Sequence, residues 1–181
     1  MKFLIQEPQK DQNFSLVYRD EDYSFDREPY EGTGFTSIMI NDLQLEIDDE
    51  GKIIYVWGLC PLIQYRKTKE VPRGYKAHSL VALLNKPPVP GISYRLNEDK
   101  RWPIYMNKKK GWICLGDPKI NKRQLIEFAP NCVATMDGQE LIAVWLHPEK
   151  LPDLNVKSRM NLERFRKRLN RKILSRELFR N

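Results

Sequence analysis

The fold class is indicated by one stretch of fifteen residues, Cys132-Val133-Ala134-Thr135-Met136-Asp137-Gly138-Gln139-Glu140-Leu141-Ile142-Ala143-Val144-Trp145-Leu146. Its two apolar runs flank an Asp-Gly pair, which is a strong short-range signal for a β-hairpin because both residues tolerate the positive φ of a tight turn. A second stretch alternates apolar and polar residues over 43–47, turns at 48–51 and returns over 52–57. Both stretches therefore predict antiparallel strand pairs.

Further strands are indicated before and after the proline-rich segment over residues 85–91. Residues 103–115 read as a hairpin with the lysine-rich tip Asn107-Lys108-Lys109-Lys110-Gly111. Residues 78–84 are apolar enough for a buried strand or a short helix, which periodicity alone does not separate. Residues 64–76 are basic and contain Pro72 and Gly74, so we expect a loop there.

Two of the hairpins share a local pattern, in which an acidic turn precedes an apolar strand that ends in tryptophan and is followed by proline. The pattern covers residues 49–61 and 137–148. An internal duplication is one explanation. The simpler explanation, which the sequence alone favours, is that both are a turn followed by a buried strand whose tryptophan closes the core.

In the last segment the apolar residues are spaced as in a helix rather than as in a strand. Residues 155–179 contain neither proline nor glycine, and Leu162, Phe165, Leu169 and Ile173 lie along one stripe of a helix. We therefore predict an α+β fold: an antiparallel β-rich domain over residues 1–154, forming a sandwich or partial barrel, with a long amphipathic C-terminal helix over 155–181. Residues 20–32 are acidic and interrupted by Pro29 and Gly32, which predicts an exposed acidic loop.

The charge of the 181-residue chain is unevenly distributed. The formal net charge is +7. Residues 155–181 hold ten basic and two acidic side chains, so the remaining 154 residues are close to neutral. That neutral part is itself divided, because residues 1–50 carry 4 basic and 13 acidic groups whereas residues 51–130 carry 16 basic and 5 acidic groups. The cations of residues 155–181 are suited to an anionic partner, and the simpler alternative is that they pair with the acidic N-terminal block or are solvated.

The candidate site residues are the cations of the C-terminal segment and of the lysine tip. Arginine dominates in the first group and binds phosphate bidentately, while lysines beside Trp102, Tyr105 and Trp112 are suited to a single-stranded nucleic acid. The simpler interpretation of the tip is that a hairpin end accommodates lysine at little cost and that Trp112 packs inward. Whether the cations of residues 66–69 and 73–76 lie near the tip cannot be determined from the sequence. The candidate nucleic-acid-binding residues are Arg164, Arg166, Lys167, Arg168, Arg171, Lys172, Lys108, Lys109 and Lys110.

These features predict a non-enzymatic polyanion-binding protein, which binds RNA or DNA independently of sequence through the Arg-rich helix. The alternative is a protein-interaction module, such as an inhibitor, immunity or assembly factor, whose basic helix docks an acidic partner. We expect no membrane partner, because the apolar stripe is narrow and lacks tryptophan. The sequence does not indicate an oligomeric state.

Metal and cofactor sites are poorly supported by the sequence. No two of the Cys and His residues are spaced like paired metal ligands, and no phosphate-binding or nucleophile motif occurs, so we expect no metal, no cofactor and no catalytic residue. The three cysteines lie in apolar runs and are an odd number, which is typical of buried thiols in a reducing compartment. Together with the short apolar run after Met1, this predicts a cytoplasmic protein.

A third interpretation is an enzyme that uses Cys114. Pro87-Pro88, then Trp102-Pro103, then Gly111-Trp112-Ile113-Cys114-Leu115 resembles the strand-to-cysteine region of ubiquitin-conjugating-like proteins, over about 30 of 181 residues. The resemblance implies a nucleophilic role for Cys114. The sequence departs from the family's pattern where it has Trp102-Pro103-Ile104 in place of His-Pro-Asn, and strands rather than helices are expected after Cys114.

Overall fold

The computed structural model describes residues 1–7, 12–29, 34–96, 100–121 and 123–151. Within these ranges the regular secondary structure consists of fifteen β-strands and no helix. The prediction of an α+β fold is therefore wrong for the described part of the chain, which is all-β. The helical component of that prediction rested on residues 155–181 alone, and these lie outside the described residues.

The first sheet has six strands in the spatial order β10-β4-β5-β6-β3-β2. Neighbouring strands are antiparallel except β10, which runs parallel to β4. Part of the predicted acidic loop is in fact strand β3, because Phe25 and Arg27 are buried there. In spatial order the strands are β10 (Tyr94–Arg95), β4 (Thr36–Ile40), β5 (Leu43–Ile47), β6 (Ile53–Leu59), β3 (Ser24–Glu28) and β2 (Ser15–Arg19).

The second sheet has seven strands in the order β7-β11-β12-β15-β14-β13-β8. Its central strands form antiparallel hairpins, as the sequence predicts for residues 103–115 and 132–146. The two short edge strands are parallel to their neighbours. In spatial order the strands are β7 (Arg66–Lys67), β11 (Ile104–Asn107), β12 (Trp112–Gly116), β15 (Glu140–Leu146), β14 (Cys132–Asp137), β13 (Gln124–Ala129) and β8 (Lys76–Ala77).

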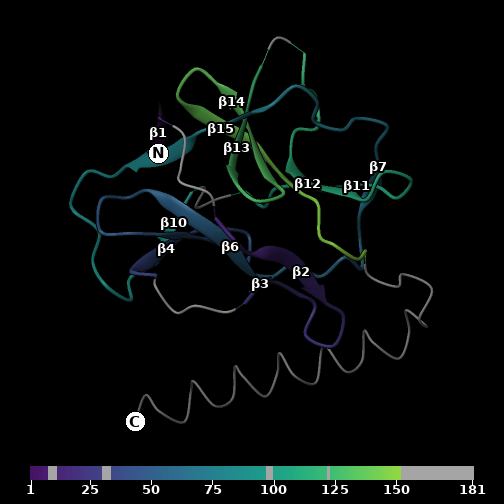
Figure 1. Ribbon diagram of the computed structural model, residues 1–181, viewed down its shortest axis with the longest axis horizontal. Helices are drawn as coiled ribbons and strands as arrows, with labels where there is room; N and C mark the ends of the chain where they lie inside the picture. Colours follow the sequence, from purple (N-terminus) through teal and green to yellow (C-terminus); the bar gives the residue numbers. More distant parts are fainter. Residues whose placement is uncertain (8–11, 30–33, 97–99, 122, 152–181) are drawn as a thin grey trace.

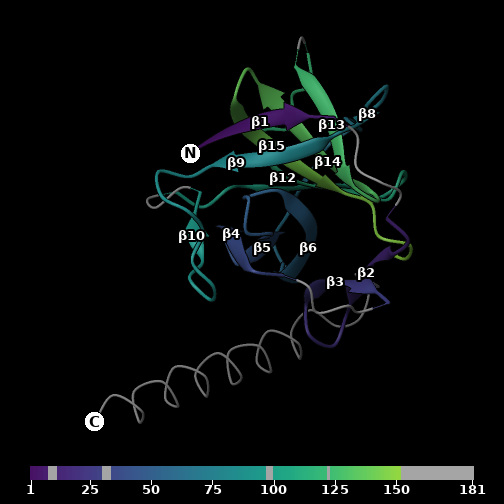
Figure 2. The same cartoon turned by 60° about the vertical axis from the view of Figure 1, so that its left-hand side comes forward.

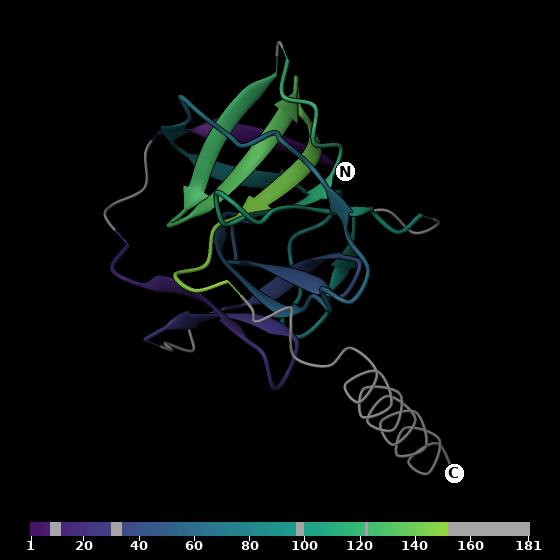
Figure 3. The same ribbon diagram turned by 90° about the vertical axis from the view of Figure 1, so that its right-hand side faces the viewer.

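The two large sheets share one hydrophobic core. Leu45 and Val56 of the first sheet and Ile113 and Val144 of the second belong to the same buried cluster. In all three ribbon views, β13, β14 and β15 (green) lie above the blue and purple strands of the first sheet (Figures 1, 2 and 3). A two-stranded sheet, β1 (Lys2–Gln6) with β9 (Ser79–Leu83), adds Phe3 and other apolar side chains to this core.

The apolar segment over residues 78–84, for which strand and helix were both open, therefore contains a strand. Among the described residues, no helix has the length and apolar character that crossing a bilayer would require.

Strands β2 to β6 and strands β11 to β15 follow the same path through their sheets. In each set the first two strands form a hairpin, the fifth strand lies beside the second, and the fourth and third follow in turn. The resulting orders are β2-β3-β6-β5-β4 and β11-β12-β15-β14-β13. A short parallel strand continues each set, since β10 lies beside β4 and β8 lies beside β13.

The pairing registers of the two sets also correspond. The fourth and fifth strands of each set have a register shift, which lies between Glu46 and Ile47 in the first set and between Thr135 and Met136 in the second. Gly58 is opposite both Leu43 and Phe25, as Leu146 is opposite both Cys132 and Ile113. Because a β-bulge and a register are specific features of a sheet, we interpret the two sets as repeats of one five-stranded unit.

Candidate polyanion-binding surface

The lysine tip is a four-residue connection between β11 and β12. Asn107, the last residue of β11, accepts hydrogen bonds from the Lys110 amide through its backbone oxygen (3.2 Å) and through Oδ1 (3.1 Å). Gly111 closes the turn at φ +76°, a conformation that glycine adopts without steric cost. The turn therefore holds Lys108, Lys109 and Lys110 outward, and all three side chains are exposed.

Strand β7 brings a second group of cations to the tip. It pairs in parallel with β11, with Arg66 opposite Tyr105 and Lys67 opposite Met106. The Thr68 amide extends this pairing by donating to the Met106 oxygen (3.1 Å), and the Asn107 side-chain amide donates to the Lys69 oxygen (3.2 Å). These bonds place the exposed cations of residues 66–69 beside the lysine tip.

Two tyrosines lie between the cations. The Arg66 guanidinium is 5.8 Å from the centre of the Tyr105 ring and donates a hydrogen bond to its hydroxyl (3.3 Å), while Lys108 Nζ is 5.5 Å from the centre of the Tyr65 ring. Each contact is within the range of a cation–π interaction. We call the exposed cations gathered here the basic surface, which consists of Arg66, Lys67, Lys69, Lys108, Lys109 and Lys110.

The six cations of the basic surface form no ion pair among the described residues, and the one acidic residue in the same segment is Glu70, which follows Lys69. In contrast, Arg19, Arg101 and Arg123 each have a carboxylate partner. Six like charges held close together attract counterions, and a polyanion gains free energy by displacing them.

The segment between β7 and β8, which we call the strap, supports one side of the basic surface. Because β7 and β8 lie at opposite edges of the second sheet, residues 68–75 must cross from one edge to the other. Val71 and Tyr75 of this strap pack against the cluster of Trp112, Cys114, Val133, Ala143 and Trp145. The strap is thus anchored by its apolar side chains, and its cations Lys69 and Arg73 are exposed.

Trp112 packs inward, as the simpler interpretation of the tip predicts. Trp112 is 8% exposed, is covered by Tyr75 in an edge-on contact (6.3 Å between ring centres) and stacks on His147 (4.8 Å). It is therefore packed and cannot offer a free face to a base. The aromatic side chains that contact cations here are Tyr65 and Tyr105. Tyr65, Arg66, Lys67 and Lys69 are not among the site residues predicted from the sequence, because no local pattern links them to the tip.

The other candidate residues cannot be placed. Arg164, Arg166, Lys167, Arg168, Arg171 and Lys172 all lie outside the described residues. Of the predicted site, the structure describes only the three lysines of the tip.

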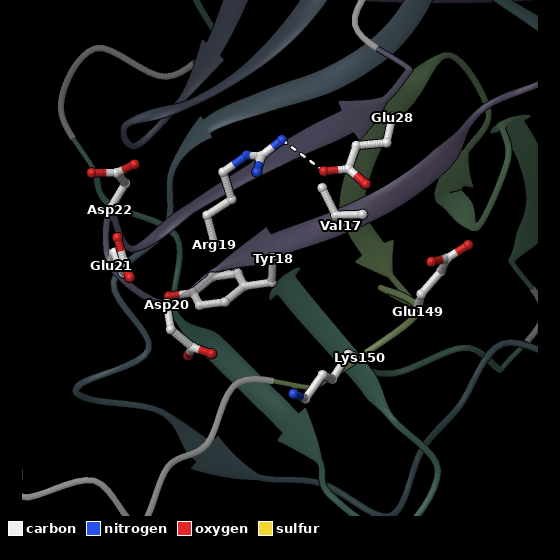
Figure 4. Close-up of a pocket in the computed structure, with 9 residues that line it drawn as sticks. All are labelled: Val17, Tyr18, Arg19, Asp20, Glu21, Asp22, Glu28, Glu149 and Lys150. Carbon is white, nitrogen blue, oxygen red and sulfur yellow. Dashed lines mark hydrogen bonds and ion pairs between the residues drawn. The ribbon is translucent and has the colours of Figure 1, made fainter.

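A second charged region occurs at the β2–β3 hairpin. Its tip carries Asp20, Glu21 and Asp22, and a cavity of about 480 Å³ lies beside it. Figure 4 shows that the lining side chains come from this hairpin and from the segment after β15, which is joined to β2 by the Glu149 amide donating to the Leu16 oxygen (3.0 Å). We call the carboxylates that line this cavity the acidic corner: Asp20, Glu21, Asp22, Glu28 and Glu149.

Arg19 and Tyr18 of this cavity already have partners. Arg19 pairs with Glu28 (2.9 Å) and with Asp26 (3.4 Å), and Lys150 is the only other cation of the lining. Tyr18 donates its hydroxyl to the Cys60 backbone oxygen (3.0 Å), and burial raises the pKa of this hydroxyl well above its ordinary value. The cavity therefore has a surplus of negative charge.

The cysteines and histidines form no recognisable site. Cys60, Cys114 and Cys132 are free and buried. Burial raises the pKa of the Cys60 thiol to about 12 and those of Cys114 and Cys132 further, so the nucleophilic thiolate is scarce at neutral pH. Cys114 also lies in a strand that is followed by strands, which gives no support to the resemblance to ubiquitin-conjugating-like proteins. Within the described ranges, no group of His, Cys, Asp and Glu is arranged to hold a metal ion.

Comparison with known proteins does not assign the chain to a family. No protein-family model, no curated protein and no solved structure matches it.

Proposed function

We propose that this chain is a non-enzymatic polyanion-binding protein whose ligand is a nucleic acid. The observation that carries the proposal is the basic surface, in which β7 and the β11–β12 tip combine six exposed cations without an ion-pair partner among the described residues. The Arg-rich sequence over residues 155–181 adds ten further cations to the same chain.

Such binding is electrostatic and largely independent of base sequence. Lysine offers a mobile point charge rather than a fixed pattern of donors, so it recognises phosphate and not base edges. If all six cations of the basic surface contact phosphate, affinity falls about 10³-fold between about 50 and 200 mM salt, because each contact releases a condensed counterion. The packing of Trp112 removes one stacking platform, which favours backbone recognition over base stacking.

The experiment compares three variants with the same change of charge. A tip variant (K108E/K109E/K110E), a segment variant (Arg164, Arg166, Lys167, Arg168, Arg171 and Lys172 to Gln) and a control variant (K2E/K86E/K100E) each lose six units of positive charge. Binding of a labelled single-stranded or duplex oligonucleotide is measured by fluorescence anisotropy at about 50 mM salt. We expect the tip and segment variants to bind at least about tenfold more weakly than the control variant.

Two results would overturn the proposal. Absence of binding by the full chain at about 50 mM salt, where phosphate contacts are strongest, excludes a nucleic-acid ligand. Binding to poly-L-glutamate in that case identifies an acidic protein as the partner class instead. Equal weakening of all three variants shows that net charge alone, and no defined surface, controls binding.

A further inference from the structure

His147 is the first residue after β15 and lies against the lysine tip. Its ring stacks on the Trp112 indole, with 4.8 Å between ring centres and 21° between the ring planes. A Cβ added to Gly111 would be 2.9 Å from His147 Nε2, so the imidazole contacts the backbone of the tip. The His147 amide donates to the Asn131 oxygen (3.0 Å), which fixes the residue at this end of the second sheet.

The imidazole of His147 has no polar partner in the part of the chain that the structure describes. It is half-buried, and neither ring nitrogen forms a hydrogen bond or an ion pair with another described residue. The other histidine differs, since Nδ1 of His78 is 3.1 Å from the Gln6 backbone oxygen. The ring of His147 can therefore take up a proton without breaking a hydrogen bond.

The charged groups near His147 come from the elements that surround it. The lysine tip, which it contacts through the glycine, contributes three ammonium groups. Glu127 belongs to the opposite side, where its Oε1 accepts a hydrogen bond from the Asn131 amide (3.2 Å). Glu149 and Lys150 follow along the chain. Across the stacked indole lies Tyr75, and burial together with Glu127 raises the pKa of its hydroxyl, which stays protonated at neutral pH.

A charge on this ring is coupled to the binding of a polyanion. Histidine is the side chain that ordinarily changes charge between pH 5 and 8, whereas lysine and arginine stay charged throughout that range. The tip lysines oppose a positive charge on His147 in the free chain, and phosphate groups bound to those lysines favour it. The stacked indole also attracts a cation through its ring face. Proton binding and polyanion binding therefore strengthen each other.

We propose that His147 is a further binding residue of the basic surface and that its protonation strengthens nucleic-acid binding as the pH falls through the neutral range. This inference rests on the proposed function, because it assumes a phosphate backbone as the ligand. It adds a pH dependence that the six lysine and arginine side chains of the surface cannot produce. The imidazolium acts on the phosphates, and the neutral ring contributes only its packing against the indole.

The first measurement is the affinity of the full chain for a labelled oligothymidylate at about pH 8 and about pH 5.5. Thymine takes up no proton in this range, so the ligand itself does not change. One added phosphate contact strengthens binding by about tenfold at about 50 mM salt. We therefore expect about tenfold tighter binding at the lower pH, measured by fluorescence anisotropy. The plot of log affinity against log salt should also be steeper there by about 0.7.

Three variants assign the effect to one side chain. H147Q removes the titrating group and should bind at both pH values as the wild type does at the higher one. H147R has a permanent charge that also stacks on an indole, so it should bind at both pH values as the wild type does at the lower one. H78Q is the matched control, because His78 follows β8 at the opposite edge of the second sheet from β7 and should leave the pH dependence unchanged. Carboxylates titrate equally in all four proteins.

Equal affinity of the wild-type chain at both pH values overturns the inference and leaves nucleic-acid binding in place. An unchanged pH dependence in H147Q, or its loss in H78Q, has the same consequence. If urea denaturation shows that H147Q does not fold, H147R decides, because a pH dependence like that of the wild type in H147R contradicts the inference. Absence of binding by the wild type at both pH values overturns the proposed function as well.

Discussion

At the scale of single residues, each repeat contains a hydrogen bond from a tryptophan indole at the same place in its sheet. The acceptor is a carboxylate in the first repeat and a hydroxyl in the second. Trp57 Nε1 donates to Glu46 Oε2 (2.5 Å) in the first sheet, and Trp145 Nε1 donates to Thr135 Oγ1 (3.0 Å) in the second. Both acceptors lie immediately before the register shift of their strand. A buried indole N–H requires an acceptor, because leaving it without one costs about 1–3 kcal/mol.

Glu46 makes this arrangement sensitive to pH. It is 8% exposed, and burial raises the pKa of its carboxyl group, although the Trp57 hydrogen bond and the nearby Arg27 oppose this effect. The folded state therefore holds the proton more tightly than the unfolded state. Stability from this group is fully present below the ordinary pKa of 4.5 and is lost as pH rises through the higher pKa of the folded state.

Replacing Glu46 by glutamine should remove this dependence. The glutamine oxygen still accepts the Trp57 N–H, and its amide does not titrate. We expect E46Q to gain stability relative to wild type as the pH rises from 4 to 7.5. The free energy of unfolding of both proteins, measured by urea denaturation, should therefore differ more in favour of E46Q at pH 7.5 than at pH 4. Parallel pH profiles of the two proteins would show that ionisation of Glu46 does not affect folding.

At the scale of elements, the pairing of β7 with β11 is the part that sequence reasoning could not recover. Hairpins are local, because turn residues and alternation within about fifteen residues define them. The pairing of β7 with β11 joins distant residues through a two-residue strand, which leaves no periodic signal. The local pattern therefore predicts a loop over residues 64–76 and a hairpin that carries the lysine tip, but it contains no signal that places Arg66 beside that tip.

Tyr75 should anchor the strap to the sheet. It packs against Trp112 and belongs to the cluster around Trp145. We expect Tyr75→Ala to lower the free energy of unfolding by about 2 kcal/mol and to shift Trp fluorescence to the red. Tyr75→Phe keeps the ring contact and should behave like the wild type. If both variants unfold like the wild type, the strap is not held by this contact.

At the scale of the whole molecule, burial in the two hydrophobic clusters protects all three cysteines. Cys60 and Cys132 belong to the core between the large sheets, and Cys114 belongs to the cluster under the strap. Burial and raised pKa both make these thiols unreactive in the folded state.

Thiol labelling at pH 8 should therefore report unfolding of the entire molecule. We expect none of the three cysteines to react with a disulfide reagent at the rate of a free thiol until urea unfolds the chain, and the three should then react together. Rapid native labelling of Cys114 alone, resolved by mass spectrometry, would contradict this and would reopen a nucleophilic role for that residue.

The amino-acid sequence by itself determined the hairpins over residues 43–57, 103–115 and 132–146 and the uneven distribution of charge, because each depends on residues that are close together along the chain. Tertiary structure alone decided that six cations from two segments lie beside one another and that strands β2 to β6 and strands β11 to β15 repeat one unit. The physical reason is that these relationships arise from sheet order and register between distant strands. Identical backbone pairing can carry side chains of opposite charge, so the repeat is visible in the fold although its tips have lost all similarity in sequence.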